Sequence, residues 1–152
     1  MTCCKEKALS YISTSEEETK KFALSFMEKL LCKKQKIVAF SGDLGAGKTR
    51  FVKGMLLHFS NIHENEVNSP TFTYLNIYPT EPVVYHFDLY RIANENIFLS
   101  MGFDEYFEKN GICLIEWAEN IFPILPQDTI KIDITSLDQT RRRIEVYEHF
   151  KF

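Results

Sequence analysis

The sequence has 152 residues, a length typical of one domain, and we expect residues 1–152 to form a single domain. Hydrophobic residues make up 45% and charged residues 26% of the chain, a globular composition that excludes a disordered or collagen-like protein. The formal net charge of −3 excludes attraction of a polyanion by bulk charge, so any contact with nucleic acid must be local or shared with a partner.

The chain also lacks the patterns of exported, membrane-spanning and zinc-binding proteins. No long apolar stretch near the start resembles a secretory signal, and runs such as residues 37–40 are far shorter than a membrane span. No spacing of cysteine and histidine suits zinc, and Cys32 and Cys113 are expected to be small buried hydrophobic residues. We therefore expect a soluble cytoplasmic protein with no membrane contact.

The first half of the chain predicts a helix, a buried strand and a second helix. Ser15 and Glu18 form a capping box, and apolar residues then recur at helical spacing up to Leu31. Residues 37–40, Ile-Val-Ala-Phe, are apolar throughout, as in a strand covered on both faces. A glycine-rich loop follows directly, and a second amphipathic helix is expected to begin near Lys48.

The second half predicts more strands than helices. Residues 71–78 and 83–89 are rich in β-forming residues and flank a turn with two prolines, so they are expected to form a loose hairpin. Residues 92–107 have a helical pattern interrupted at Gly102, and residues 112–115 form a second fully apolar strand. Residues 130–134 and 143–147 alternate between apolar and polar and predict a C-terminal antiparallel hairpin.

Helices interleaved with short buried strands indicate an α/β fold. We expect a three-layer α/β/α sandwich resembling the P-loop NTPases. Its central sheet should be mixed and mostly parallel, with the antiparallel hairpin at the C-terminus.

The loop after the first buried strand matches the phosphate-binding pattern G-x-x-x-x-G-K-[ST] at Gly42, Gly47, Lys48 and Thr49. Glycines allow backbone N–H groups to surround a phosphate, and the following helix directs its positive end to the same point. The lysine is expected to reach the β- and γ-phosphates, and the threonine hydroxyl to bind Mg²⁺. The residues expected to contact the nucleotide are Asp43, Leu44, Gly45, Ala46, Gly47, Lys48, Thr49 and Arg50.

A phosphate loop of this kind also needs a carboxylate at the end of a buried strand to order the metal ion. Two candidates end apolar strands, Asp88 and Glu116, although an acid there can also cap a helix or pair with a lysine. Arg91 could stabilise charge on the γ-phosphate, but a salt bridge is the commoner role. His86 could be a base, but a hydrogen-bonded structural histidine is the better interpretation.

Four blocks of sequence together resemble one family. They are Gly-Asp-Leu-Gly-Ala-Gly-Lys-Thr at 42–49, Asn-Ser-Pro-Thr-Phe-Thr at 68–73, His-Phe-Asp-Leu-Tyr-Arg at 86–91 and Ile-Glu-Trp-Ala-Glu at 115–119. In this order they resemble the TsaE (YjeE-type) ATPases of tRNA threonylcarbamoyladenosine biosynthesis, over nearly the whole chain. The resemblance implies an Mg²⁺-dependent ATPase that works with the TsaB and TsaD proteins and meets tRNA indirectly through that complex.

The resemblance also assigns roles to individual residues. Lys48 matches the phosphate-binding lysine, Thr49 and Glu116 match magnesium ligands, and Asp88 matches an acid that is catalytic or orders the metal. Catalytic roles are therefore expected for Asp88, Lys48 and Glu116, and metal ligation for Thr49, Glu116 and Asp88.

Two further segments resemble parts of the family that respond to the nucleotide or to the partner. Ser69, Pro70 and Thr71 match a switch-like segment, and Trp117 matches a tryptophan at the nucleotide site or the partner face. Taken without the resemblance, Trp117 would be interpreted as a core aromatic. Arg50 departs from the small hydroxyl residue that the family often has at that position.

Other functions remain open at this point. A P-loop small-molecule kinase is the main alternative, whereas a GTPase is disfavoured because no N-K-x-D motif is present. A non-enzymatic binding module is also possible in principle, because partners can supply missing catalytic groups. We therefore expect weak ATPase activity alone, stimulated by the partner complex. The arginines at 141–143 could contact tRNA, but solvated turn charges are the commoner explanation.

Overall fold

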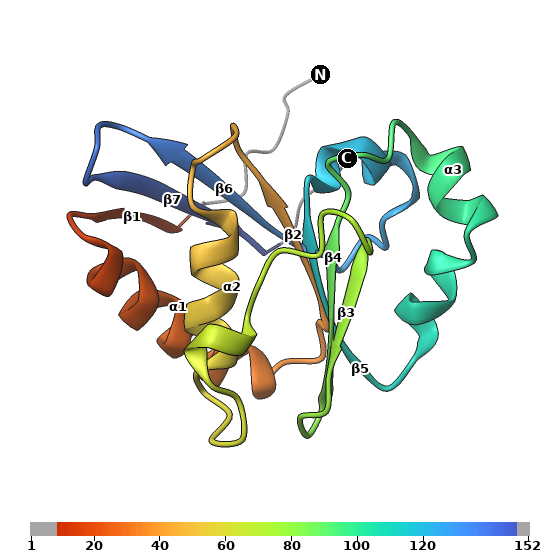
Figure 1. Cartoon of the computed structure of the whole chain (residues 1–152), viewed down its shortest axis with the longest axis horizontal. Helices are drawn as coiled ribbons and strands as arrows, with labels where there is room; N and C mark the ends of the chain where they lie inside the picture. The colour runs from red at the N-terminus through yellow and green to blue at the C-terminus, as the bar shows by residue number, and fades with distance from the viewer. Residues whose placement is uncertain (1–8, 149–152) are drawn as a thin grey trace.

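The computed structural model describes residues 9–148, which form one seven-stranded sheet with helices on both faces (Figure 1). The strand order is β1-β7-β6-β2-β5-β4-β3. The strands are β1 (Leu9–Ser13), β2 (Ile37–Ser41), β3 (Leu75–Tyr78), β4 (Val83–Asp88), β5 (Gly111–Glu116), β6 (Ile130–Ser136) and β7 (Arg142–Tyr147).

The centre of the sheet is parallel and both sides are antiparallel. The pairings β6–β2, β2–β5 and β5–β4 are parallel, whereas β1–β7, β7–β6 and β4–β3 are antiparallel. The predicted mixed sheet and the C-terminal hairpin, β6–β7, are thus both present. Parallel pairing is confined to the four central strands, so it accounts for half of the pairings.

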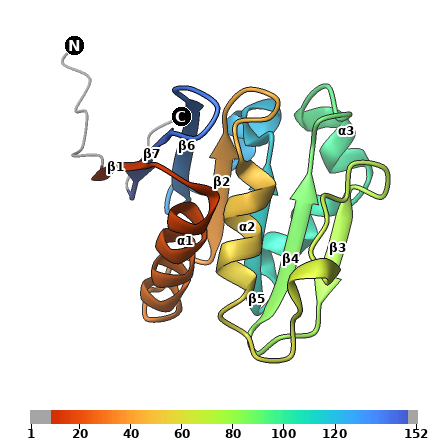
Figure 2. The same cartoon turned by 60° about the vertical axis from the view of Figure 1, so that its left-hand side comes forward.

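Two α-helices, α1 (Glu16–Leu31) and α2 (Lys48–Leu56), cover one face of the sheet (Figure 2). The other face is covered by α3 (Glu95–Ser100) and the 3₁₀ segments η2 (Phe103–Glu108) and η3 (Ala118–Ile124). A third 3₁₀ turn, η1 (Glu64–Glu66), precedes β3. The predicted three-layer α/β/α sandwich is confirmed.

Ser15 caps the start of α1 as predicted, but the reciprocal bond of the predicted capping box goes to the preceding residue. Ser15 has an extended backbone and its side chain accepts a hydrogen bond from the Glu18 amide, 3.1 Å away. The Glu18 carboxylate in turn accepts from the backbone N–H of Thr14. Further along, α1 packs closely on α2 at Gly54, where an added Cβ would lie 2.7 Å from that of Ala23. A small residue is therefore needed where these helices meet.

Apolar side chains form a core on each face of the sheet. One core joins α1 and α2 to the sheet and includes Phe40, Phe51 and Met55; the other lies under α3, η2 and η3 and includes Phe87 and Phe98. All six residues of β5 are buried, as expected for a strand covered on both faces. The carboxyl ends of β2, β4 and β5 carry the site residues.

Two local predictions are wrong, and two elements were missed. Residues 71–74 form a turn, with the Tyr74 amide bonded to the Pro70 carbonyl, so the predicted strand at 71–78 begins only at Leu75. The predicted interruption of the helical pattern at 92–107 is confirmed at Gly102, whose φ of 73° ends α3, although the pattern begins only at Glu95 and its second segment is a 3₁₀ helix. Strand β1 and segment η3 were not predicted, and Cys32 is exposed, since it caps the end of α1.

Within the described residues, no helix has the length and apolar character needed to cross a membrane.

Candidate functional site: a phosphate loop and two strand-end carboxylates

The phosphate loop connects the carboxyl end of β2 to the first residue of α2, at the upper end of the sheet in Figure 1. Its glycines have positive φ: 143° at Gly42, 77° at Gly45 and 112° at Gly47. Residues with a Cβ rarely adopt these conformations. At Gly42 a side chain is also excluded sterically, because a Cβ would lie 2.3 Å from the Ile134 carbonyl oxygen.

The Lys48 ammonium group lies inside this loop. It donates hydrogen bonds to the carbonyl oxygens of Gly42 and Asp43, the second at 3.1 Å. It also lies 3.8 Å from the centre of the Trp117 ring, within cation–π range. Burial lowers the pKa of Lys48, and the negative charges of Glu116 and its neighbours partly oppose that shift. The lysine is therefore held where a phosphate on the loop would meet it.

Thr49 and Glu116 are in direct contact. The Thr49 hydroxyl lies 3.0 and 2.9 Å from the two carboxylate oxygens of Glu116 and, having one proton, donates to one of them at a time. His86 reaches the same carboxylate from β4, with its Nε2 atom 2.7 Å from Oε1. A carboxylate only accepts, so the hydrogen bond places the imidazole proton on Nε2. Two of the three predicted metal ligands thus meet, and a buried histidine orients the carboxylate.

Asp88 lies beside Glu116, since β4 and β5 are parallel and the two residues are register partners. Its Oδ2 atom accepts hydrogen bonds from the hydroxyls of Ser69 and Thr71, the latter at 2.9 Å. Its Oδ1 atom accepts from the Tyr90 amide at 3.0 Å. The predicted switch segment is therefore tied directly to the second predicted acid.

Trp117 closes the site at the end of β5. Its φ of 59° is unusual for a bulky residue, and such strain is commonest at functional sites. The ring is half-buried, with Lys48 on it and Tyr90 at 5.0 Å between ring centres. Trp117 thus lines the site, and its ring also packs against the core under α3, η2 and η3.

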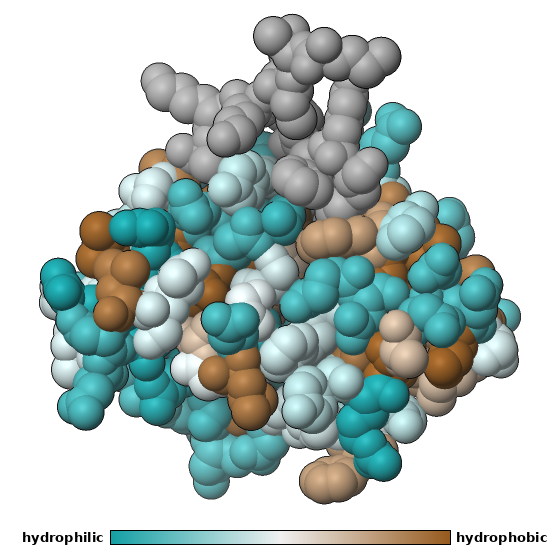
Figure 3. All heavy atoms as spheres, turned by 90° about the horizontal axis from the view of Figure 1, so that it is seen from above, coloured by the Kyte–Doolittle hydropathy of each residue, from teal (hydrophilic) through white to brown (hydrophobic). Residues whose placement is uncertain are grey.

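These elements surround a cavity of about 390 Å³. Its lining combines the loop, both strand-end acids, the hydroxyls of the switch segment and two aromatic rings: Leu44, Gly45, Ala46, Gly47, Lys48, Thr49, Arg50, Ser69, Thr71, Asp88, Tyr90, Glu116 and Trp117. Arg50 is exposed and pairs with Glu16 at 3.6 Å. Figure 3 views this end of the molecule, where hydrophobic side chains form separate patches among polar ones.

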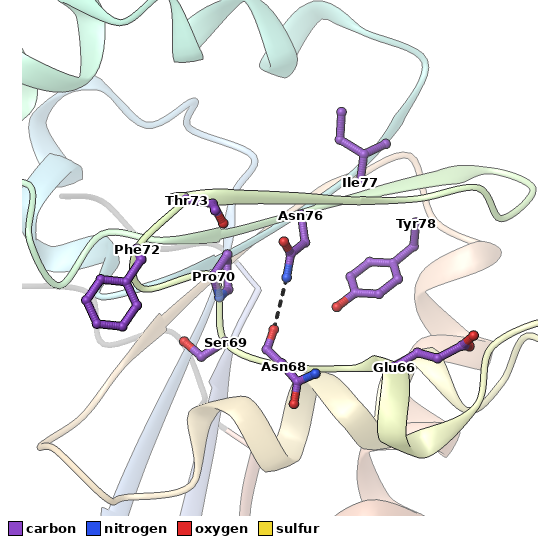
Figure 4. Close-up of a pocket in the computed structure, with 9 residues that line it drawn as sticks. All are labelled: Glu66, Asn68, Ser69, Pro70, Phe72, Thr73, Asn76, Ile77 and Tyr78. Carbon is purple, nitrogen blue, oxygen red and sulfur yellow. Dashed lines mark hydrogen bonds between the residues drawn. The ribbon is translucent and has the colours of Figure 1, made fainter.

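A second cavity, of about 480 Å³, lies on the other side of the switch segment. Figure 4 shows it between the chain at 66–70 and strand β3, with Tyr78 directed into it and Asn76 bonded to the Asn68 carbonyl at 3.1 Å. Pro70 lines this cavity and does not line the first. The switch segment therefore contributes to both cavities, with Ser69 in the lining of each.

Most predicted site residues meet in the first cavity, and the exceptions are clear. The Asp43 side chain is exposed, and only its carbonyl enters the site, where it binds Lys48. Arg91 makes no salt bridge with any residue in the range 9–148; its guanidinium lies 5.4 Å from the ring centre of Phe72. Tyr90 lines the cavity but was not predicted from the sequence. Its position two residues after Asp88 could have indicated that it lies at the site.

The side chains at the site that could bind a metal ion do so through oxygen atoms. Thr49, Glu116 and Asp88 present a hydroxyl and carboxylates, the donors that Mg²⁺ prefers. Among residues 9–148 no group of three or more His, Cys, Asp or Glu residues could hold a metal ion alone. Magnesium usually binds through one or two carboxylates together with phosphate oxygens, so the donors present fit that ion.

Comparison with known proteins identifies the family of this chain. Residues 13–144 match the family model described as "Threonylcarbamoyl adenosine biosynthesis protein TsaE". The chain belongs to the TsaE family. Among TsaE proteins, that of Rickettsia prowazekii is 40% identical over 140 residues, covering 91% of this chain and 94% of the relative. The TsaE protein of Bacillus subtilis is 38% identical over 141 residues, covering 91% and 84%.

The fold is shared with a solved structure as well. The crystal structure of Bacillus subtilis YdiB superposes with a TM-score of 0.73 at 32% sequence identity. The match covers 95% of this chain and 87% of that one.

Proposed function

We propose that this protein binds and hydrolyses ATP with Mg²⁺ at the cavity of about 390 Å³ and thereby supports threonylcarbamoylation of tRNA. The observation that carries the proposal is the convergence of Lys48, the Thr49–Glu116 pair and Asp88 on a loop whose glycines form an anion cradle. Membership of the TsaE family supports the tRNA role, because its relatives are named for that biosynthesis.

Each group has a role that follows from its position. Lys48 and the loop amides would hold the phosphates, and Thr49 and Glu116 would hold the metal ion. Magnesium, when bound, supplies neutralisation of charge on the phosphate oxygens. Asp88, bonded to Ser69 and Thr71, would order the metal shell or the attacking water and would link that chemistry to the switch segment.

We further propose that the TsaB and TsaD proteins are the partners, and that tRNA is met only through their complex. With a net charge of −3 the chain has little bulk attraction for tRNA by itself, which favours an accessory role. Hydrolysis is then expected to be slow alone and faster in the assembly, as when a partner completes an NTPase site. The cytoplasm, where tRNA is modified, is the expected location.

ATP turnover with and without purified TsaB and TsaD tests the proposal. We expect slow phosphate release by the wild-type protein, stimulation by the two partners together, and no release by Lys48→Ala. Lys53→Ala is the matched control, since it removes a half-buried lysine from the same helix outside the cavity. Calorimetry that detects no ATP binding, or equal binding by Lys48→Ala, rules the nucleotide site out. If ATP still binds but TsaB and TsaD do not stimulate its hydrolysis, only the proposed partnership is rejected.

A further inference from the structure

The three consecutive arginines at 141–143 are separated by the fold. Arg141 turns back to the carboxylate of Asp138 in the β6–β7 turn, and Arg143 is exposed. Arg142 extends in another direction, and its Nε atom donates a hydrogen bond to the carbonyl oxygen of Ala46, 3.0 Å away. One of the three charges thus lies against the phosphate loop, 96 residues away in the sequence.

The guanidinium of Arg142 is held from several sides. Its Nη1 atom donates to the carbonyls of Asp138 and Arg141, at 2.7 and 2.9 Å. Its backbone lies inside the sheet, in register with β1 on one side and β6 on the other. The side chain therefore joins the β6–β7 turn to the phosphate loop and is less mobile than a solvated arginine.

The hydrogen bond from Arg142 to the Ala46 carbonyl also orients the peptide plane between Ala46 and Gly47. The carbonyl of Ala46 and the N–H of Gly47 belong to one trans peptide plane, so they point in opposite directions. Arg142 holds the carbonyl from outside, since it is not among the described residues that line the nucleotide cavity, whereas both loop residues are. The Gly47 N–H therefore points toward the cavity side, and it makes no backbone hydrogen bond to any residue in 9–148.

We propose that Arg142 is a positioning residue for phosphate binding: by holding the Ala46 carbonyl, it aims the Gly47 amide at the phosphate. Gly47 has a φ of 112° and no Cβ, so little else restrains this peptide plane from rotating. The inference rests on the proposed nucleotide site, and it gives the C-terminal hairpin a role there. An arginine acting through its charge alone would need no such contact.

Arg143 provides a matched control, because Arg143→Gln removes the same charge from the next residue of the same strand. We would measure ATP affinity in Mg²⁺ by calorimetry, melting temperature, and the ¹H–¹⁵N resonance of Gly47 in nucleotide-free protein. Arg142→Gln is expected to weaken ATP binding about tenfold or more, the usual effect of losing one charge-assisted hydrogen bond. It should also shift the Gly47 resonance. Arg142→Lys, which keeps one donor, should weaken binding about threefold.

Arg143→Gln should leave affinity within about twofold and the Gly47 resonance in place. The proposal is overturned if Arg142→Gln binds ATP as tightly as Arg143→Gln, or if the Gly47 resonance does not move. If Arg142→Gln does not fold, the same two criteria apply to Arg142→Lys. If the wild-type protein does not bind ATP, the proposed function is wrong. The Gly47 resonance in nucleotide-free protein still tests whether Arg142 orients the loop.

Discussion

The buried contact between His86 and Glu116 provides the sharpest test of the site's construction. The two residues are almost fully inaccessible, at 0% and 2% exposed, and the hydrogen bond between their side chains is 2.7 Å long. Replacing His86 by leucine leaves the carboxylate with one donor, the hydroxyl of Thr49. Hydrogen bonds to charged groups contribute about 1.5–3 kcal/mol to stability, and a buried carboxylate that loses a donor destabilises the folded protein. In a chain of 152 residues that corresponds to a melting temperature lower by about 3–12 °C.

A double-mutant cycle separates this interaction from general damage to the core. His86→Leu, Glu116→Met and the double variant would be compared by urea unfolding followed by far-ultraviolet circular dichroism. Because the double variant buries neither a lone carboxylate nor an unpaired imidazole, its loss of stability should be smaller than the sum of the single losses by about 1.5–3 kcal/mol. His58→Leu, at an exposed histidine, should change stability by less than about 0.5 kcal/mol. Single losses that add to within about 0.5 kcal/mol refute the reasoning.

Two other expectations concern the loop and the turn beside it. Gly42→Ala should lower stability by at least about 2 kcal/mol in denaturant unfolding, because its Cβ would overlap the Ile134 carbonyl and φ is 143°. Gly45→Ala, with open space around it, should cost about 1 kcal/mol; equal losses would contradict the steric argument. Hydrogen bonds from the backbone amide of Arg141, and then from its guanidinium, hold the pKa of Asp138 below its ordinary value of 3.8. The ionised carboxylate therefore stabilises the turn fully above pH 3.8. This stabilisation is lost as the pH falls through the lowered pKa of the folded protein. In an NMR titration Arg141→Gln should raise this pKa while leaving it below 3.8, and an unchanged value would argue against the side-chain contact.

Local patterns in the sequence were sufficient for several parts of this protein. The N-cap at Ser15 predicted the start of α1, and the uniformly apolar run at 37–40 predicted β2. The phosphate loop could be predicted because its glycines, lysine and threonine are contiguous and their conformations are local. The acids at 88 and 116 could be singled out because each ends a buried strand.

Local sequence patterns predicted secondary structure least well where an element depends on contacts with a neighbouring segment. Strand β1 has mostly exposed or half-exposed residues and exists by pairing with β7, so it has no apolar periodicity of its own. The run after Pro70 has β-forming residues but is a turn, since the Thr71 hydroxyl binds Asp88 and the Tyr74 amide donates to the Pro70 carbonyl. Tertiary contacts therefore overrode local propensity in both segments.

Only the tertiary structure decided which of the candidate groups act together. Thr49 and Glu116 are 67 residues apart and meet because β2 and β5 are parallel neighbours whose carboxyl ends lie at one edge of the sheet. The arginine triplet could be interpreted from sequence as surface charge, and one member instead reaches the loop across 96 residues. Sequence fixes residue types and local backbone preferences, whereas contacts between distant segments follow from strand order, which no local pattern encodes.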